Sequence, residues 1–428
     1  MRIMIAAGLV ALGLTLPTAV RSEEADEGPV LELDGSDTVD TTTPEGDVPS
    51  PEHARIGDDL TTRVGRIVDR TVIGGYGEIE YHNAAGQDSE FVAHRYVLFV
   101  YSQLSERIST STEIEFEFAG SPLKKDGVQG AGEVLLEFSV VDFKIDDWMI
   151  LRGGIILVPF GAFNIRHDAP TRDLTERPKP LTTITPTTWF EAGFGLLGDI
   201  DLGADVFLDY EVYVINGLDA KIDRKHGMKG AVGSKLEDNN DDKAVVGRIG
   251  LSPMLGIDVG VSGYTGVYDD ADNRVNMVGA DITLQFGWFE FLGEYVRAFI
   301  DEGFVEGFSP GSPTNTREAV PRAMQGFYVQ ANMHFPIPGL FDLFPPDMAD
   351  ATMTGVIRYE DTDTDLDRVD ENDVQKLTFG LNFRPIEAYV IKTEVQLVTN
   401  GAGGVSRNLF SGNWDPEPKF VASMAWLF

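Results

Sequence analysis

Apolar and polar residues alternate with a period of two along most of the chain after Thr71, which is the pattern of β-strands. The clearest stretch, EIEFEF at Glu113–Phe118, sets glutamates on one face against apolar residues on the other. The same alternation recurs at Gln375–Phe383 and Tyr389–Leu397. In a soluble sandwich the apolar face forms the core, whereas in an outer-membrane barrel it meets lipid and the charged face lines the lumen. Alternation alone is compatible with both.

The last stretch, KFVASMAWLF at Lys419–Phe428, favours the barrel. Phe420, Met424, Trp426 and Phe428 share one face, and the chain ends on an aromatic residue. An exposed apolar edge strand promotes aggregation of a soluble protein. A membrane barrel, in contrast, needs a final strand that pairs with the first one and turns aromatic side chains toward lipid.

The number of strands and the lengths of their connections support the same conclusion. Sixteen strands are predicted, at 71–82, 91–104, 109–119, 132–145, 148–158, 187–198, 203–216, 243–252, 256–268, 274–286, 288–300, 323–335, 351–360, 373–384, 387–399 and 417–428. Tight turns are predicted at Ser105–Ile108, Asp146–Asp147, Asp199–Leu202, Pro253–Leu255 and Pro385–Ile386, and long polar loops at 120–131, 159–186, 217–242, 301–322, 361–372 and 400–416. Only 269–273 and 336–350 fit this alternation less well. We therefore predict an all-β protein, a 16-stranded antiparallel transmembrane β-barrel with a short N-terminal disordered or helical extension.

The residues before the barrel divide into three parts. Residues 1–22 begin with Arg2 and continue in an apolar run, Ile3–Leu16, that is shorter than the roughly 20 residues of a membrane-spanning helix. They are predicted to be a cleavable signal peptide. Residues 23–52 are acidic and rich in Pro and Thr, and we expect a disordered linker. Residues 53–70 have apolar residues at helical spacing and predict a short amphipathic helix, which either packs on the barrel end or forms a small oligomerising coil. We expect the barrel to occupy residues 71–428.

Charge and cysteine content narrow the function. The formal net charge is −35, which argues against nucleic acid as a partner. The chain has no cysteine, which excludes disulfides, thiolate zinc sites and a cysteine nucleophile. Together with the signal peptide, these features predict the outer membrane of a Gram-negative bacterium, with membrane lipid and lipopolysaccharide as neighbours.

Motifs for catalysis or metal binding are weak. Histidines are scattered without metal-ligand spacing, at His53, His82, His94, His167, His226 and His334. The run DTDTDLD at Asp361–Asp367 resembles a calcium loop, but Leu366 stands where a tight-turn glycine belongs, so we expect a solvated outer loop that holds divalent cations loosely. No Ser-His-Asp order stands out. We expect no enzyme activity, no cofactor and no dedicated metal site.

One stretch resembles a known family. The run GGIILVPFGAFNIRHDAPTRDLTERPKP at Gly153–Pro180 is similar to a strand and loop of the phosphate-selective porin O and P family, with Phe160–Gly161 at the strand end and Arg172–Leu174 and Glu176–Arg177 in the loop. The opening GGYGEIEYH at Gly74–His82 and the terminal aromatic residue are also similar. The resemblance covers residues 71–428 and implies a 16-stranded, usually trimeric, passive channel. Its phosphate-selective members have a dense lumenal ladder of arginines and a lysine cluster, which this chain lacks.

The alternation also assigns residues to the lumen, where selectivity depends on charges at the narrowest section. The predicted lumenal acids are Glu78, Glu80, Glu113, Glu115, Glu117, Glu133, Glu137 and Glu394, and the predicted bases are Arg152, Arg248, Arg358, Lys376, Arg384 and Lys392. The acids lie mainly on early strands and the bases on late ones. If these acids and bases face each other across the lumen, they create an electric field across it. The alternative is that they form ion pairs that make the barrel wall more rigid.

The loop at 159–186 carries Arg166, Arg172, Arg177 and Lys179 and has a net positive charge in an acidic chain. We expect it to fold inward and narrow the pore, with weak anion preference. The alternative is that such loops pair with lipopolysaccharide phosphates or with acidic neighbours.

The sequence therefore predicts a porin, a water-filled channel for passive diffusion of small polar or ionic solutes, with anions such as phosphate among them and a homotrimeric assembly. The alternatives are a structural or adhesive barrel with a closed lumen and a substrate-specific gated transporter.

Overall fold

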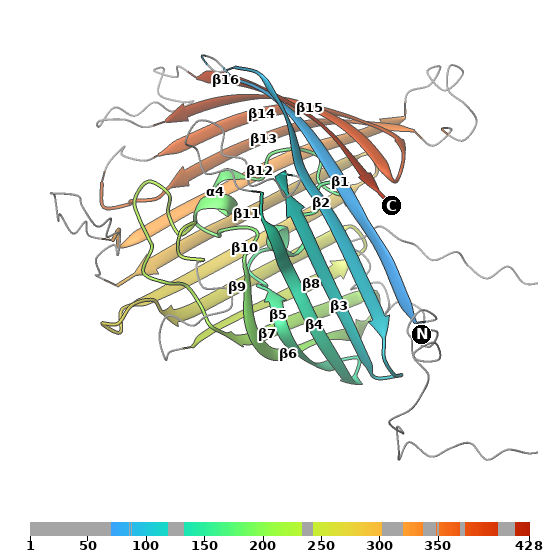
Figure 1. Cartoon of the computed structure of the whole chain (residues 1–428), viewed down its shortest axis with the longest axis vertical. Helices are drawn as coiled ribbons and strands as arrows, with labels where there is room; N and C mark the ends of the chain where they lie inside the picture. The colour runs from blue at the N-terminus through green and yellow to red at the C-terminus, as the bar shows by residue number, and fades with distance from the viewer. Residues whose placement is uncertain are drawn as a thin grey trace, which may run out of the picture.

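The computed structural model describes residues 70–84, 86, 88–118, 132–232, 243–301, 320–336, 348, 351–368, 373–400 and 416–428. Within them, sixteen strands close into one antiparallel barrel, each strand paired with its neighbours along the chain and β1 paired with β16 (Figure 1). The strands are β1 (Thr71–Ala84), β2 (Glu90–Gln103), β3 (Ile108–Glu117), β4 (Val134–Asp146), β5 (Met149–Leu157), β6 (Phe190–Gly203), β7 (Val206–Ile215), β8 (Ala244–Met254), β9 (Ile257–Val267), β10 (Arg274–Phe286), β11 (Phe289–Ile300), β12 (Ala323–Pro336), β13 (Thr352–Asp363), β14 (Val374–Ile386), β15 (Tyr389–Asn400) and β16 (Glu417–Leu427). The predicted fold class is confirmed.

Most strand ends lie within a few residues of the predicted ones, and the largest difference is in β6. The turn predicted at Asp199–Leu202 is wrong, since Asp199 pairs with Asp209 inside the β6–β7 ladder. The acidic residues there alternate with apolar ones and continue the strand. The chain turns instead at Ala204 and Asp205, whose φ angles of 55° and 63° suit a tight hairpin turn.

Two predicted proline turns are displaced in the same way. Pro253 lies inside β8 and Pro385 inside β14, each at a shift in strand register. Proline has no N–H to donate to a ladder, and a bulge is where a strand tolerates that loss. The turns follow two residues later, at 255–256 and 387–388.

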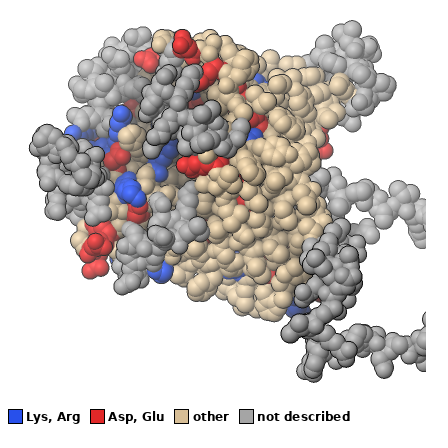
Figure 2. Space-filling view, in the orientation of Figure 1, with Lys and Arg blue, Asp and Glu red and all other residues tan. Residues whose placement is uncertain are grey.

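The outward face of the barrel is apolar. Large side chains that are more than two fifths exposed cover it, among them Val141, Phe143, Phe194, Ile249, Val261, Phe291 and Phe379. Trp148 and Trp288 stand exposed beside short turns, as aromatic residues do at a membrane interface. Figure 2 shows a wall with few charged side chains and a concentration of Lys, Arg, Asp and Glu toward one end of the molecule. This distribution fits a barrel whose wall contacts lipid.

Several predictions concern residues outside the described part. The signal peptide (1–22), the acidic linker (23–52) and nearly all of the amphipathic helix (53–70) are among them, as are the loops at 120–131 and 401–415 and most of 301–322 and 336–350. Among the residues that the structure does describe, no helix is long and apolar enough to cross a membrane.

Candidate functional site: a segment inside the barrel

Residues 158–189, which connect β5 to β6, lie inside the barrel and are called the inward segment below. They contain two short helices, α3 (Ala162–Ile165) and α4 (Lys179–Thr183), and α4 packs against β12 and β13 on the far wall (Figure 1). Leu174, Ile184 and Trp189 of the segment are at most 2% exposed. The expectation that this loop folds inward is confirmed.

The Phe160–Gly161 pair is where the segment leaves the wall. Gly161 has a φ of 74°, and a Cβ there would lie 2.3 Å from Oε2 of Glu294, so only glycine fits without strain. Its N–H donates to Ser262 Oγ at 3.1 Å, and the N–H of Phe163 donates to Glu294 Oε1 at 2.6 Å. The pair therefore turns the chain across the lumen toward β9 and β11.

Three lumenal glycines receive apolar side chains of the segment. A Cβ on Gly279 would lie 2.9 Å from the ring of Phe160. One on Gly380 would lie 2.5 Å from Leu174, and one on Gly326 would lie 2.6 Å from Pro180. Because these approaches are closer than normal van der Waals contact, larger residues in the wall would push the segment away from β10, β14 and β12.

Side chains of the late strands donate to backbone carbonyls of the segment. The four contacts are Lys392 Nζ to Ala169 O (2.6 Å), Arg384 Nη2 to Pro170 O (2.7 Å), Asn382 Nδ2 to Asp173 O (2.6 Å) and Arg358 Nη2 to Glu176 O (2.8 Å). Carboxylates of the wall accept in turn from segment N–H groups, with Glu394 bonded to Thr175 and Glu360 to Lys179. The wall thus satisfies backbone groups that the irregular stretch between α3 and α4, and the first turn of α4, leave unpaired.

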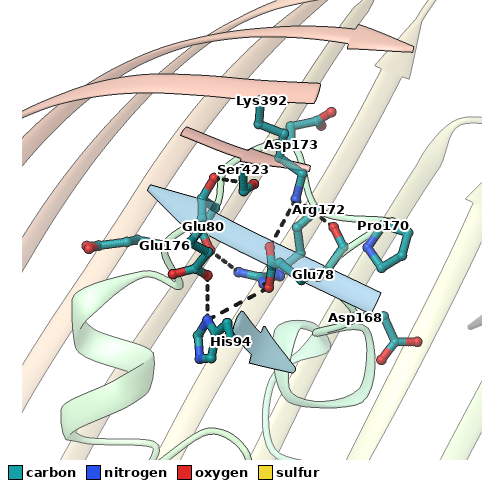
Figure 3. Close-up of polar contacts among 12 residues, drawn as sticks. Glu78, Glu80, His94, Asp168, Pro170, Arg172, Asp173, Glu176, Lys392 and Ser423 are labelled. Carbon is teal, nitrogen blue, oxygen red and sulfur yellow. Dashed lines mark hydrogen bonds and ion pairs between the residues drawn. The ribbon is translucent and has the colours of Figure 1, made fainter. Parts of the chain in front are cut away.

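Charged side chains converge on Glu78 of β1 (Figure 3). Its Oε2 lies 3.5 Å from Arg172 Nη2 of the segment and 3.4 Å from Arg95 Nε of β2, and its Oε1 lies 3.9 Å from Lys392 Nζ of β15. Glu78 is 1% exposed, so these are buried charges that compensate one another. A second group forms around Glu176, whose carboxylate lies 3.7 Å from Lys376 Nζ and also contacts Lys419.

Environment shifts the titration of the segment's acids in opposite directions. Burial raises the pKa of Asp168 to about 6, against the opposing effect of the neighbouring His167. Burial also acts to raise the pKa of Glu176, but the ammonium groups of Lys376 and Lys419 outweigh it and hold that pKa at about 2. Glu176 is therefore ionised at neutral pH, where its ion pairs hold the segment in place.

The predicted constriction residues have three different environments. Arg166 is exposed, Arg172 is buried against Glu78, and the half-buried Arg177 donates to Thr188 Oγ1 at 2.9 Å. Burial, together with Arg95 and Arg172, lowers the pKa of Arg177 to about 10, which leaves it charged at neutral pH.

The other predicted residues also divide by their contacts. Arg358, Lys376, Arg384 and Lys392 all reach the inward segment, as described above. Arg152 pairs with Asp142 of the neighbouring strand at 2.7 Å, whereas Glu113 and Glu115 are buried and Glu117 is half-buried at the end of β3. Lys179 is half-buried in α4, and Glu133 is exposed just before β4.

Sequence reasoning missed several wall residues that hold the segment, namely Ser262, Glu294, Glu360, Asn382 and Ser423. The only available signal was their position in the alternation of inward and outward residues along each strand. That position places them on the lumenal face but does not distinguish them from other polar residues there.

A second loop, residues 216–232, covers the segment. The N–H of Met228 donates to Thr183 O of α4 at 2.8 Å. Arg224 Nε pairs with Asp365 Oδ2 at 2.7 Å, and Thr364 donates to the carbonyl of Arg224. The expectation of a solvated outer loop at Asp361–Asp367 that holds divalent cations loosely is therefore wrong for Asp365, which is fully buried and paired with arginine.

A disulfide tests the position of the segment. Thr175 Oγ1 of the segment and Ser423 Oγ of β16 are 2.8 Å apart, close to the geometry in which two cysteine sulfurs can bond. The variant T175C/S423C, in a chain without natural cysteine, is expected to oxidise almost completely in the folded protein. The control T175C/S139C should stay reduced, because Ser139 is adjacent to the inward-facing Val140 and points to the opposite face. Mass spectrometry of peptides with and without reductant would measure both, and a reduced first pair would contradict this position of the segment.

Comparisons with known proteins agree with the fold. No family model matches the chain. An uncharacterized protein of Aquifex aeolicus (strain VF5) is 28% identical over 351 residues, which cover 78% of this chain and 77% of that protein. OmpF of Salmonella typhi, solved in complex with daunomycin, superposes with a TM-score of 0.52 at 9% identity, covering 84% of this chain and 97% of that one. The anion-selective porin of Comamonas acidovorans superposes with a TM-score of 0.49 at 10% identity, covering 84% and 99%. At such identities the likeness to OmpF concerns the fold alone.

Proposed function

We propose that this chain is an outer-membrane porin, a channel for passive diffusion of small polar or ionic solutes. The observation that carries the proposal is a charged segment held across the lumen of a closed barrel with an apolar outer wall. Such a segment restricts the cross-section and sets charges where solutes pass. The porin fold of OmpF and the resemblance to the phosphate-selective porin O and P family support it. We also propose a Gram-negative outer membrane as its location and a homotrimer as its assembly.

One observation favours a second candidate, a barrel whose lumen is closed until the segment moves. Charged residues of the wall that meet the segment are almost completely buried: Glu78, Arg358, Glu360, Lys376 and Lys392 are each at most 5% exposed. Groups lining a wide, water-filled pore would be more accessible. Other charges remain solvated, since the side chain of Asp209 is 46% exposed and that of Arg152 24%. A closed or gated lumen thus stays the alternative function.

Recording from single channels in planar bilayers distinguishes the two candidates. An open porin is expected to show long-lived steps of conductance at low voltage, and a closed barrel none until the segment is released. Folded protein that never conducts under any voltage would contradict the porin proposal.

We further propose weak anion preference, with Arg166 as its main determinant among the three segment arginines. Arg172 is neutralised by Glu78, whereas Arg166 is exposed. At physiological salt, ions in solution screen electrostatic interactions over about 8 Å. The charges nearest the path of the solute therefore determine the ion preference. Replacing Arg166, Arg172 and Arg177 with Gln is expected to shift the reversal potential in a salt gradient toward cations, and Arg166→Gln alone should give most of that shift. Equal potentials in the wild type and the triple variant would show that the segment does not line the path.

A further inference from the structure

Histidine and carboxylate side chains come together at three places among the described residues. Each group contains one histidine and two acids whose potential ligand atoms lie within 4.8 Å of one another. The groups are Glu78, Glu80 and His94; Glu113, Glu137 and His167; and Asp173, Glu290 and His334. Spacing along the chain gave no indication of them, because each group joins residues of two strands, and in two of the groups the inward segment contributes a third member.

In two of the groups, contacts with other residues of the protein account for the close approach of the histidine and the acids. His94 faces Glu80 through Nδ1, and its Nε2 accepts from Arg95 Nη2 at 2.9 Å, so neither ring nitrogen is free. In the group of His334, Asn332 Nδ2 donates to Asp173 at 2.8 Å and to Glu290 at 2.7 Å. In the first group the oxygens of Glu78 have no hydrogen-bond partner but face the cationic groups of Arg95, Arg172 and Lys392. Hydrogen bonds and ion pairs within the protein therefore explain both arrangements.

His167 in the remaining group has a different pattern. Its Nδ1 lies 2.9 Å from the carbonyl oxygen of Asn164, which can only accept, so Nδ1 carries the proton. Its Nε2 then points toward Glu137 Oε2 at 3.1 Å. In the neutral ring two lone pairs would face each other there, which requires either a cation that contacts both atoms or a proton on the ring or on the carboxyl group. A metal-binding histidine usually donates one ring N–H to a backbone carbonyl or a carboxylate and ligates the metal through its other nitrogen, and the Nδ1–H bond of His167 is of this kind.

One buried carboxylate oxygen of the group lacks a donor. Glu113 is 1% exposed, and its Oε1 has no hydrogen-bond partner. Glu137 is 1% exposed and lies at a register shift between β3 and β4, where Glu113 pairs with Phe138 and Ile114 with Leu136. This bulge leaves Glu137 unpaired in the ladder and turns it into the lumen beside Glu113. An unpartnered buried carboxylate is costly unless a cation satisfies it.

The surrounding charges favour a divalent cation. Glu115 and Asp168 add two carboxylates near the pair, and Arg95, Arg172 and Arg177 add three guanidinium groups. With a neutral imidazole, four carboxylates and three guanidinium groups leave negative charge unbalanced, and Arg95 and Arg172 are also shared with Glu78. Because the ligand atoms lie within 4.8 Å of one another, small side-chain movements bring them to a single ion with metal–ligand distances of about 2 Å.

We propose that Glu113, Glu137 and His167 bind a divalent first-row transition-metal ion, for which imidazole and carboxylate are suitable ligands. The ion links the inward segment, through His167, to β3 and β4. It thereby fastens a side of the segment that the late strands do not reach. The proposal concerns binding and does not depend on whether the lumen conducts.

Titration of the purified, folded full-length protein with Zn²⁺ after chelator treatment tests this site. Isothermal titration calorimetry should show one tight Zn²⁺ site per chain, and Co²⁺ should give visible absorption bands at the same stoichiometry. Glu113→Gln and His167→Gln should each weaken the affinity by about tenfold to a hundredfold or more. His334→Gln is the matched control, because His334 belongs to a group whose acids are hydrogen-bonded within the protein. This variant should bind Zn²⁺ as the wild type does.

A second measurement guards against misfolding of the variants. The amide of Glu113→Gln can donate to Glu137, so this variant should retain the heat-modifiable mobility of the folded barrel. Zn²⁺ should slow tryptic cleavage after Arg166 in the wild type but not in Glu113→Gln. If His167 is simply protonated, the wild type will show no tight site, which overturns the proposal. Equal Zn²⁺ affinity in the wild type, Glu113→Gln and His167→Gln overturns it as well.

Discussion

Deletion of Phe428 is expected to lower the amount of folded, heat-modifiable protein in outer-membrane fractions severely. Phe428 closes the barrel, because its N–H and carbonyl each bond to Gly75 of β1 at 3.0 Å. Its ring stacks on Tyr96 with centroids 5.0 Å apart, and a Cβ on Gly75 would lie 2.7 Å from that ring. Two hydrogen bonds and a stacked aromatic pair together stabilise the seam by about 2–4 kcal/mol.

The matched control is Phe420→Ala. Phe420 lies on the same outward face of β16, is 39% exposed and has its ring 6.3 Å from that of Tyr81. It occupies the other end of the strand, however, so its loss should leave closure at Gly75 intact and reduce assembly only slightly. Phe428→Tyr should assemble normally. Wild-type yields of the Phe428 deletion on unheated gels would contradict a role for this residue in closing the barrel.

Much of the barrel could be predicted from sequence because the two faces of each strand meet different environments. The outer face meets lipid, and the inner face meets the polar lumen. The alternation at Glu113–Phe118 specifies both the strand and its orientation, and Glu113 and Glu115 are buried inside. Strand ends were less predictable where a residue type is common both in turns and in β-bulges. Pro253 and Pro385 are turn residues by propensity, but here they lie in bulges.

The contacts of the inward segment could not be predicted in the same way. Parity places Arg358 in the lumen, but it does not reveal that this guanidinium reaches the carbonyl of Glu176, which is 182 positions away. Arg166 and Arg172 are equivalent in the sequence, yet one is exposed and the other is paired with Glu78. Tertiary approach decides whether a lumenal charge meets water, a carbonyl or an opposite charge, and local pattern contains no information on that approach.

Replacing Arg358 with Met is expected to release the inward segment from the late strands. Arg358 is 2% exposed and donates through Nε to Glu360 Oε1 at 2.7 Å and through Nη2 to Glu176 O at 2.8 Å. Removing one member of a buried pair costs about 3–5 kcal/mol, and Lys376, 3.0 Å from Glu360, offsets part of this. A loss of about 3 kcal/mol in docking raises the open population of the segment by roughly a hundredfold.

Trypsin measures that opening directly, since Arg166 and Arg172 provide cleavage sites within the segment, whereas trypsin does not cut the Arg177–Pro178 bond. Cleavage of the folded Arg358→Met protein should be roughly a hundredfold faster than that of the wild type when closing outpaces cutting. Arg152→Met is the control, because Arg152 is also a lumenal arginine but pairs with Asp142 on the adjacent strand and does not touch the segment. Cleavage there should stay near the wild-type rate. If both variants are cleaved alike, Arg358 does not hold the segment and the wall contacts at Pro170, Asp173 and Thr175 suffice. Faster cleavage of Arg358→Met together with larger conductance would mean that docking of this segment controls passage through the barrel.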